Sequence, residues 1–293
     1  MTSDRFPTST VADVDGASLH AYVMGAPTDR PSVVFEAGIG GFGAQWCHIQ
    51  PLVAERTLTV SYDRAGLGQS DRGLGQRTPE VIGDELAALL SALMVEPPYV
   101  LVGHSLGGLL MRCFAGRRQD DVAGLVLVDA SHEQQMTRAR IPGWMVGVTR
   151  LTYRIQAGLA GVPRLGRVIA ARGVADGRRG MTQAQWDRCV ALASRTERFR
   201  TMQSETAHFD RLFGLDHGVP TDFADLPLRV VTAGESMAGT SRRLNAQHQR
   251  NQADLVQLST NGSQVTVAGA THLSILLDRQ HAATVADAIL SVT

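Results

Sequence analysis

The feature that most limits the fold of this chain is a buried strand that runs through a glycine-flanked turn into an apolar helix. Tyr99-Val100-Leu101-Val102 is an unbroken apolar run, Gly103-His104-Ser105-Leu106-Gly107 follows it, and Gly108-Leu109-Leu110 begins the helix. Two glycines let the strand and the helix approach closely, and the central Ser105 is expected at strained backbone angles. Its hydroxyl would then project above the carboxyl edge of a parallel sheet, where doubly wound folds bind ligands.

Short apolar segments without alternation recur on both sides of this turn. Such runs are typical of strands buried on both faces of a parallel sheet. They are Ser32–Phe35, Leu58–Tyr62, Gly124–Val128, Leu228–Thr232 and Gln264–Val267. Helical patterns lie between them, one of them starting at Thr78-Pro79 and stopping before Pro97-Pro98. The alternation predicts an α/β fold with a mostly parallel doubly wound sheet and right-handed crossovers.

The start of the chain departs from this pattern. Val11–Asp13 and Leu19–Met24 flank Asp15-Gly16, a strong signal for a two-residue hairpin turn. We therefore expect an antiparallel pair to open the sheet.

The strand signal disappears between about residues 132 and 220, where Arg, Gln and Met become frequent. We predict a core domain from residues 1–131 and 221–293 with a helical cap at 132–220. One cap helix would present a stripe of larger side chains, which either packs the cap onto the core or lines a ligand site. The stripe comprises Phe199, Met202, Thr206, Phe209 and Phe213.

Charge and composition exclude several classes of protein. The 293 residues carry 28 Lys+Arg against 28 Asp+Glu, and no long basic stripe accumulates, so a nucleic-acid partner is not expected. No apolar run approaches the roughly 18 residues of a membrane span. Met1–Thr10 lacks the apolar core of a secretory signal, and Cys47, Cys113 and Cys189 are too few and too scattered for a disulfide framework. We expect a cytoplasmic protein with reduced, buried thiols.

Four segments together resemble the α/β-hydrolase superfamily over nearly the whole chain. Besides the turn around Ser105, the sequence has a glycine-rich loop after a strand, an Asp-Arg-x-Gly-x-Gly-x-Ser stretch and a histidine after the last strand. In this chain they read Phe35-Glu36-Ala37-Gly38-Ile39-Gly40-Gly41, Tyr62-Asp63-Arg64-Ala65-Gly66-Leu67-Gly68-Gln69-Ser70-Asp71 and Gly269-Ala270-Thr271-His272. The resemblance implies the α/β-hydrolase fold.

The resemblance also implies a serine nucleophile and a histidine base. A serine hydroxyl is a weak nucleophile at neutral pH unless a base takes its proton, so Ser105 needs such a partner. His272 is the candidate, because it follows the last strand and precedes a helix. His20 in the hairpin, His104 within the turn and His248 on an expected surface helix are poorer candidates.

The acid that orients the histidine is the point at which the sequence departs from the family pattern. Many relatives have Gly-x-x-Asp after the penultimate strand, but here the turn reads Gly234-Glu235-Ser236-Met237. Asp129, which ends the preceding strand, is the expected replacement, since some relatives place their acid there. Glu235, an acid from elsewhere such as Asp225, or no acid at all remain alternatives; Asp129 could also simply cap the segment after it.

An oxyanion hole would complete the site. The family pattern places its backbone donors on Ile39 and Leu106. Ala37-Gly38 stands where many relatives have His-Gly, which keeps the amide but leaves the loop conformation open. Gly40, Gly41 and Gly43 could serve only a tight turn.

No cofactor or metal is expected. Glu205, His208 and His217 match no metal motif and read as a solvated face. No Gly-x-Gly-x-x-Gly motif indicates a dinucleotide. Asp63 and Arg64 are expected to form an internal ion pair beneath the site.

These features predict a cofactor-independent serine hydrolase, most simply a carboxylesterase, acting on a small molecule. Trp144 and Met145 in the cap suggest a small to medium apolar substrate. The alternatives are a proline aminopeptidase, a thioesterase, a carbon–carbon hydrolase, a perhydrolase or a slow-turnover receptor. A peptidase would need a cap carboxylate for the substrate amine, for which Glu205, Asp210 and Asp216 are available.

Overall fold

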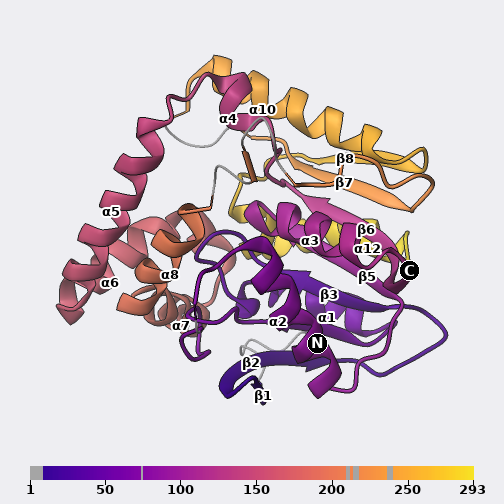
Figure 1. Cartoon of the computed structure of the whole chain (residues 1–293), viewed down its shortest axis with the longest axis horizontal. Coiled ribbons are helices and arrows are strands. Elements are labelled where there is room, and N and C mark those ends of the chain that lie inside the picture. Colours follow the sequence, from indigo (N-terminus) through magenta and orange to yellow (C-terminus); the bar gives the residue numbers. More distant parts are fainter. Residues whose placement is uncertain (1–8, 74, 209–211, 214–217, 236–239) are drawn as a thin grey trace.

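The fold was analysed on a computed structural model, which describes residues 9–73, 75–208, 212–213, 218–235 and 240–293. Its centre is an eight-stranded sheet in the order β1-β2-β4-β3-β5-β6-β7-β8 (Figure 1). The strands are β1 Thr10–Val14, β2 Ala17–Met24, β3 Ser32–Glu36, β4 Thr59–Tyr62, β5 Tyr99–His104, β6 Val122–Val128, β7 Leu228–Ala233 and β8 Gly262–Val267.

The strand directions agree with the sequence. β1 and β2 pair antiparallel across Asp15-Gly16, β2 pairs antiparallel with β4, and the remaining neighbours are parallel. Asp15 has φ 51° and Gly16 has φ 81°, as a primed hairpin turn requires. The predicted fold class is confirmed.

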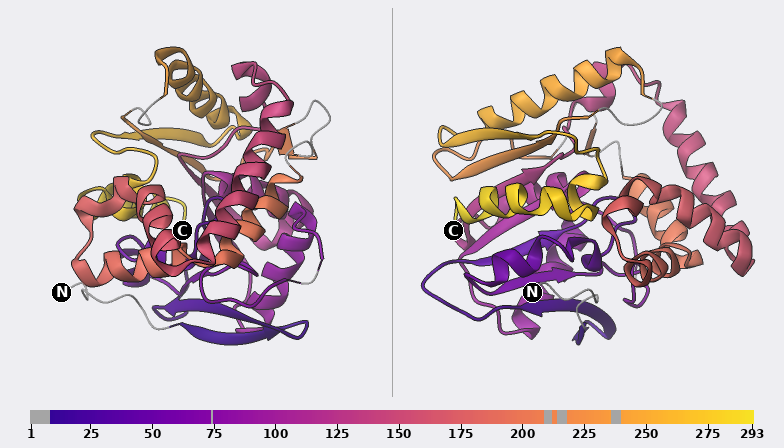
Figure 2. Two further views of the ribbon diagram at one scale, coloured as in Figure 1. Left: turned by 90° about the vertical axis from the view of Figure 1, so that its left-hand side faces the viewer. Right: turned by 180° about the vertical axis from the view of Figure 1, so that it is seen from behind.

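Helices cover both faces of the sheet, as Figures 1 and 2 show. Val100 and Val102 of β5 belong to the core on the side of α1 and α12, whereas Leu101 between them belongs to the core on the side of α2 and α3. This alternation explains why the strand is apolar without interruption. These helices and the C-terminal ones are α1 Gln50–Ala54, α2 Pro79–Ala92, α3 Leu106–Arg117, α10 Arg242–Leu255, α11 Ser274–Leu277 and α12 Arg279–Leu290. Short 3-10 turns occupy Gly43–Trp46, Gln119–Asp121, Ala175–Gly180 and Val256–Leu258.

A helical insertion lies between β6 and β7, beyond the carboxyl ends of the central strands (Figure 1). It consists of α4 Gln135–Ala139, α5 Trp144–Ala160, α6 Pro163–Gly173, α7 Gln183–Ala193 and α8 Thr196–Thr206. α5 packs on α8 and forms the outer edge of the molecule in Figure 1 and in the right-hand view of Figure 2.

The predicted stripe does not occupy a single helix. Phe199, Met202 and Thr206 lie on α8, which ends at Thr206. Phe213 lies beyond that end and packs near Leu106 and Leu109, and Phe209 is outside the described residues. Helical spacing in the sequence continued past the point where the helix stops.

Cys47, Cys113 and Cys189 are free and buried, as expected. Among the described residues, no helix is both long enough and apolar enough to cross a bilayer. Of the segment Met1–Thr10, in which no secretory signal is expected, residues 1–8 lie outside the described part of the chain.

Candidate active site

The turn after β5 presents Ser105 at the amino end of α3. Ser105 has φ 54° and ψ −123°, an angle pair that a side chain adopts only under strain. The close approach behind it requires glycine, because a Cβ on Gly107 would lie 2.6 Å from the carbonyl oxygen of Glu36. The local sequence therefore forces the serine out above the edge of the sheet.

His272 meets this serine from the other end of the chain. Its Nε2 lies 3.1 Å from Ser105 Oγ, and its Nδ1 lies 2.6 Å from Asp129 Oδ2. The three residues follow β5, β6 and β8, whose carboxyl ends share one edge of the sheet. With Nδ1–H donating to the carboxylate, the lone pair of Nε2 faces the serine hydroxyl, which is the arrangement that a general base needs.

Asp129 is buried and accepts hydrogen bonds through both of its oxygens. Besides the contact with His272, Oδ1 accepts from the Ala233 backbone N–H at 3.0 Å and contacts His248 Nε2 at 2.9 Å. Burial alone would raise the pKa of this carboxyl, but the bonds from His248 and His272 outweigh it and hold the pKa well below its ordinary value. The side chain is therefore a carboxylate at any working pH.

The other acids that the sequence offered lie elsewhere. Glu235 is exposed, with its backbone N–H donating to Ala270 O, and it makes no side-chain bond to His272. Asp225 is also exposed and lies by Val122, at the start of β6 and so at the opposite edge of the sheet. Met237 falls outside the described residues.

His248, expected on a surface helix, is half-buried and reaches the site. It lies on α10, and its ring nitrogen reaches the carboxylate that also contacts His272. Burial would lower the pKa of His248, but the hydrogen bond to Asp129 and the charge of that carboxylate raise it. The only hint in the sequence is its position on a helix that follows β7.

His104 supports His272 from beneath. The two rings lie 4.6 Å apart between centroids, and His104 Nε2 donates to the carbonyl oxygen of His272 over 2.8 Å. Burial and the neighbouring His272 lower the pKa of His104 to about 3, so its ring stays neutral. Although this side chain is not aimed at Ser105, its hydrogen bond holds the loop that carries His272.

The expected oxyanion donors lie beside the serine. Leu106 is the first residue of α3, so its N–H has no acceptor within that helix. Ile39 and Gly38 line the same cavity as Ser105, and a Cβ on Gly38 would lie 3.0 Å from the Cβ of Ser105. The loop needs Gly40, because its φ is 60° and a side chain there would meet Met202 of α8.

Arg64 fixes the carbonyl groups of this loop, and its partner is not the expected one. It forms ion pairs with Glu36 at 2.5 Å and Glu205 at 2.9 Å, and it donates to the carbonyl oxygens of Ala37 and Gly38. The expected Asp63–Arg64 pair is wrong. Asp63 instead accepts from the backbone N–H groups of Gly43 and Gln69 and from the hydroxyl of Tyr22, so its carboxylate is satisfied without Arg64.

The ion pair with Arg64 also places Glu205, one of the three residues considered as metal ligands. Glu205 is buried on α8 against Arg64, not on a solvated face. His217 lies outside the described residues. Within the described part of the chain, no group of three His, Cys, Asp or Glu side chains could hold a metal ion.

The cavity above Ser105 has a volume of about 320 Å³. The insertion supplies much of its wall, including Tyr153 of α5, Ile169 of α6, and Phe199 and Met202 of α8. The expectation that Trp144 and Met145 shape this pocket is wrong, because both are exposed and neither lines it. They lie at the outward-facing start of α5.

Comparisons with known proteins agree with this architecture. A family profile described as "alpha/beta hydrolase fold" matches residues 31–160. The chain is 33% identical over 116 residues to the protein YqjL of Bacillus subtilis. The matched region covers 40% of this chain and 46% of that protein. The matched part is thus less than half of the relative's length.

Two solved structures resemble the chain over nearly their whole length. The enol-lactonase from Burkholderia xenovorans has a TM-score of 0.69 at 19% identity, covering 97% of this chain and 99% of its own. A thermophilic esterase from Thermogutta terrifontis has a TM-score of 0.66 at 16% identity, covering 97% of both chains. At such identities the likeness shows the fold and not the reaction. Together, the profile match and the two structures show that the chain has the α/β-hydrolase fold.

Proposed function

We propose that the protein is a cofactor-independent serine hydrolase that cleaves carboxylic esters through an acyl-enzyme. One observation carries the proposal: Ser105 Oγ lies 3.1 Å from His272 Nε2 while Asp129 holds the other ring nitrogen at 2.6 Å. A nucleophile, a base and an orienting carboxylate in this geometry are the parts that acyl transfer needs.

The reaction follows from the positions of the atoms. Ser105 Oγ attacks the ester carbonyl as His272 Nε2 takes its proton, and the N–H groups of Ile39 and Leu106 receive the oxyanion. The imidazolium then gives the proton to the leaving alcohol as the carbon–oxygen bond breaks. Water, deprotonated by the same imidazole, cleaves the acyl-enzyme and restores the serine hydroxyl.

The nucleophile and the cavity limit the classes of substrate that the site could accept. A serine forms an acyl ester, whereas alkyl-enzyme chemistry uses a carboxylate nucleophile, so epoxide and haloalkane substrates are disfavoured. Ile169, Phe199 and Met202 give the cavity an apolar wall suited to a small or medium acyl or alcohol group. We also propose that residues 132–220 act as a cap over a core formed by residues 1–131 and 221–293, since α5, α6 and α8 all contribute to this wall.

An aminopeptidase reading has less support from the described residues. Glu205 is bonded to Arg64 and does not line the cavity, so it is poorly placed to bind a substrate amine. Asp210 and Asp216, the other cap carboxylates considered, lie outside the described residues.

The direct test is hydrolysis of p-nitrophenyl esters of increasing acyl length by the full chain. Ser105→Ala should lower turnover on the order of a millionfold, because the nucleophile is removed. Ser91→Ala, the same change on the exposed surface of α2, should leave it unchanged. Equal turnover by wild type and Ser105→Ala would refute the mechanism. Labelling of Ser105 by a fluorophosphonate without steady ester turnover would favour the receptor alternative.

A further inference from the structure

The outer face of the insertion carries an unusual concentration of exposed apolar side chains. Among the described residues, twelve large apolar side chains are exposed, and nine of them lie between Trp144 and Val168. On α5 these include Trp144, Val148, Leu151, Ile155 and Leu159, with Trp144 69% and Leu151 55% exposed. We call these five residues, with Leu165 of α6, the outer apolar face.

The spacing of these residues places them on one side of α5. Steps of four, three, four and four residues follow the helical repeat, so the side chains form a single stripe. The opposite side of α5 is already used, because Ala157 and Ala160 are buried and Tyr153 packs with the cluster around Phe199. The helix is thus apolar on a side that nothing in the described structure covers (Figure 1).

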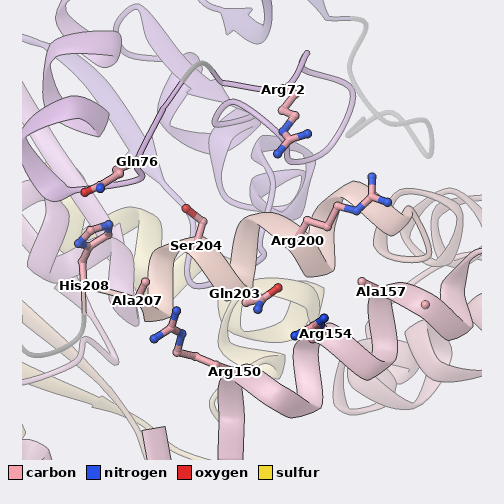
Figure 3. A pocket seen from close by; sticks show the side chains of 11 residues that line it. Arg72, Gln76, Arg150, Arg154, Ala157, Arg200, Gln203, Ser204, Ala207 and His208 are labelled. Carbon is pink, nitrogen blue, oxygen red and sulfur yellow. The ribbon is translucent and has the colours of Figure 1, made fainter. Parts of the chain in front are cut away.

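The segment that contains the outer apolar face also has an uneven charge. Residues 134–175 contain seven arginines and no aspartate, glutamate or lysine. Arg150 and Arg154 of α5, with Arg72 and Arg200, line a surface pocket of about 620 Å³ between α5 and α8 (Figure 3). Glu197 pairs with Arg72 and Arg200, whereas no ion pair reaches Arg150 or Arg154 in the described residues.

We propose that α5 and α6 dock this protein on the surface of an anionic lipid bilayer. A helix with an apolar face of Trp, Leu and Ile and flanking arginines lies in the plane of a bilayer, with its apolar side among the headgroups and its cations at the phosphates. The outer apolar face supplies the first element, and Arg150 and Arg154, exposed at the edge of α5 next to α8, supply the second.

Charge favours the bilayer over a second copy of the chain. A symmetric dimer would bring two surfaces rich in arginine and free of acids against each other, which costs repulsion. The anionic headgroups of a bilayer would instead neutralise the arginines of the docked protein. Docking depends on this surface and not on the reaction at Ser105, although Tyr153 and Gln156 on the inner side of α5 line the catalytic cavity.

The test is flotation of the full chain with large vesicles of pure phosphatidylcholine or with roughly 30% phosphatidylglycerol. We expect binding to the anionic vesicles that weakens with salt. Leu151→Gln/Ile155→Gln should lower partitioning roughly tenfold or more by removing apolar contact. Val11→Gln/Met94→Gln, the same kind of change at two exposed positions outside α5 and α6, is the matched control and should bind as wild type.

A second pair of variants isolates the charge. Arg150→Gln/Arg154→Gln should weaken binding to anionic vesicles by roughly fivefold for each arginine, since each contributes that much near such a surface. Turnover of a soluble ester by these variants should not change, which separates a failure of docking from a failure of the hydrolase mechanism. A blue shift of Trp144 fluorescence on vesicle addition, absent in Trp144→Phe, would place the stripe at the lipid.

Two results would overturn the proposal. One is the absence of binding to anionic vesicles at low salt. The other is a dimer, seen by light scattering, that Leu151→Gln/Ile155→Gln dissociates while no variant binds vesicles; the face would then be an interface between copies.

Discussion

Asp129 is the residue on which the polar contacts of the site converge. Its two oxygens receive His272, His248 and the N–H of Ala233, and the side chain is 2% exposed. A carboxylate held on both oxygens cannot rotate, so it fixes the plane of the His272 ring as well as its tautomer.

Replacing this carboxylate tests the choice of acid. Asp129→Asn should lower kcat for a p-nitrophenyl ester by roughly ten-thousandfold, because the amide N–H donates to Nδ1 and favours the tautomer in which Nε2 carries the proton and cannot accept one. Glu235→Gln makes the matched change at the exposed acid and should have little effect. A larger loss with Glu235→Gln would show that the acid is misassigned.

His248 can be tested through stability as well as rate. His248→Gln keeps a neutral donor to Asp129, whereas His248→Leu removes the donor, so only the leucine should lower kcat, by roughly tenfold or more. Because the folded pKa of His248 is raised, its charge stabilises the fold below its unfolded pKa of about 6.5, and this contribution is lost as pH rises through the folded pKa. Urea unfolding should therefore show a larger difference between wild type and His248→Gln at about pH 5.5 than at about pH 9. A difference independent of pH would mean that His248 is neutral in the fold.

The sequence could predict Ser105, His272 and Asp129 as candidates because each follows a recognisable strand. It could not predict His248 or the role of His104. His248 reaches Asp129 from α10, 119 positions later in the chain, and no local pattern encodes where that helix lies over the sheet.

At the scale of elements, Arg64 ties the insertion to the core. The guanidinium is 1% exposed and joins Glu36 at the end of β3, the carbonyl groups of the loop after it, and Glu205 on α8. The loop that carries Ile39 and the helix that carries Phe199 and Met202 are therefore held by one buried cation.

Glu205→Leu should lower the free energy of unfolding by about 3 kcal/mol, because it leaves part of a buried charge without its partner. Glu197→Gln, the control on the same helix, breaks pairs with the exposed Arg72 and Arg200 and should cost less than about 1 kcal/mol. Chemical denaturation of both variants measures the contrast. Equal losses would mean that Arg64 does not hold α8.

The sequence predicted best the elements whose side chains all face one environment, the apolar core. The central strands β3 to β7 are buried on both faces, and their apolar runs match the observed bounds within one or two residues. The insertion helices face the cavity, the core and solvent at once, so Met202 and Trp144 read alike in the sequence although one lines the cavity and the other is exposed.

At the scale of the whole molecule, the net charge is zero but the charges are distributed unevenly along the chain. Since residues 134–175 carry seven arginines without an acid, the rest of the neutral chain carries an equal negative excess. These arginines form no run of consecutive charges, but Arg150 and Arg154, one helical turn apart, line the same surface pocket.

This segregation predicts two different responses to salt. Raising the NaCl concentration from about 0.05 to about 0.5 M shortens the screening length severalfold and should release the protein from anionic vesicles. Turnover of a neutral soluble ester should stay nearly constant, because the contacts within the triad are short and largely buried. A parallel fall in both quantities would place the salt-sensitive charges at the active site.

The three buried thiols have a practical consequence. Burial raises the pKa of Cys47 and Cys189 to about 12 and that of Cys113 to about 11, so the native protein should react slowly with maleimides. A single thiol introduced on the outer side of α5 by Leu151→Cys would then take a fluorophore selectively. The wild-type chain is in effect already a cysteine-silent background for spectroscopic labelling.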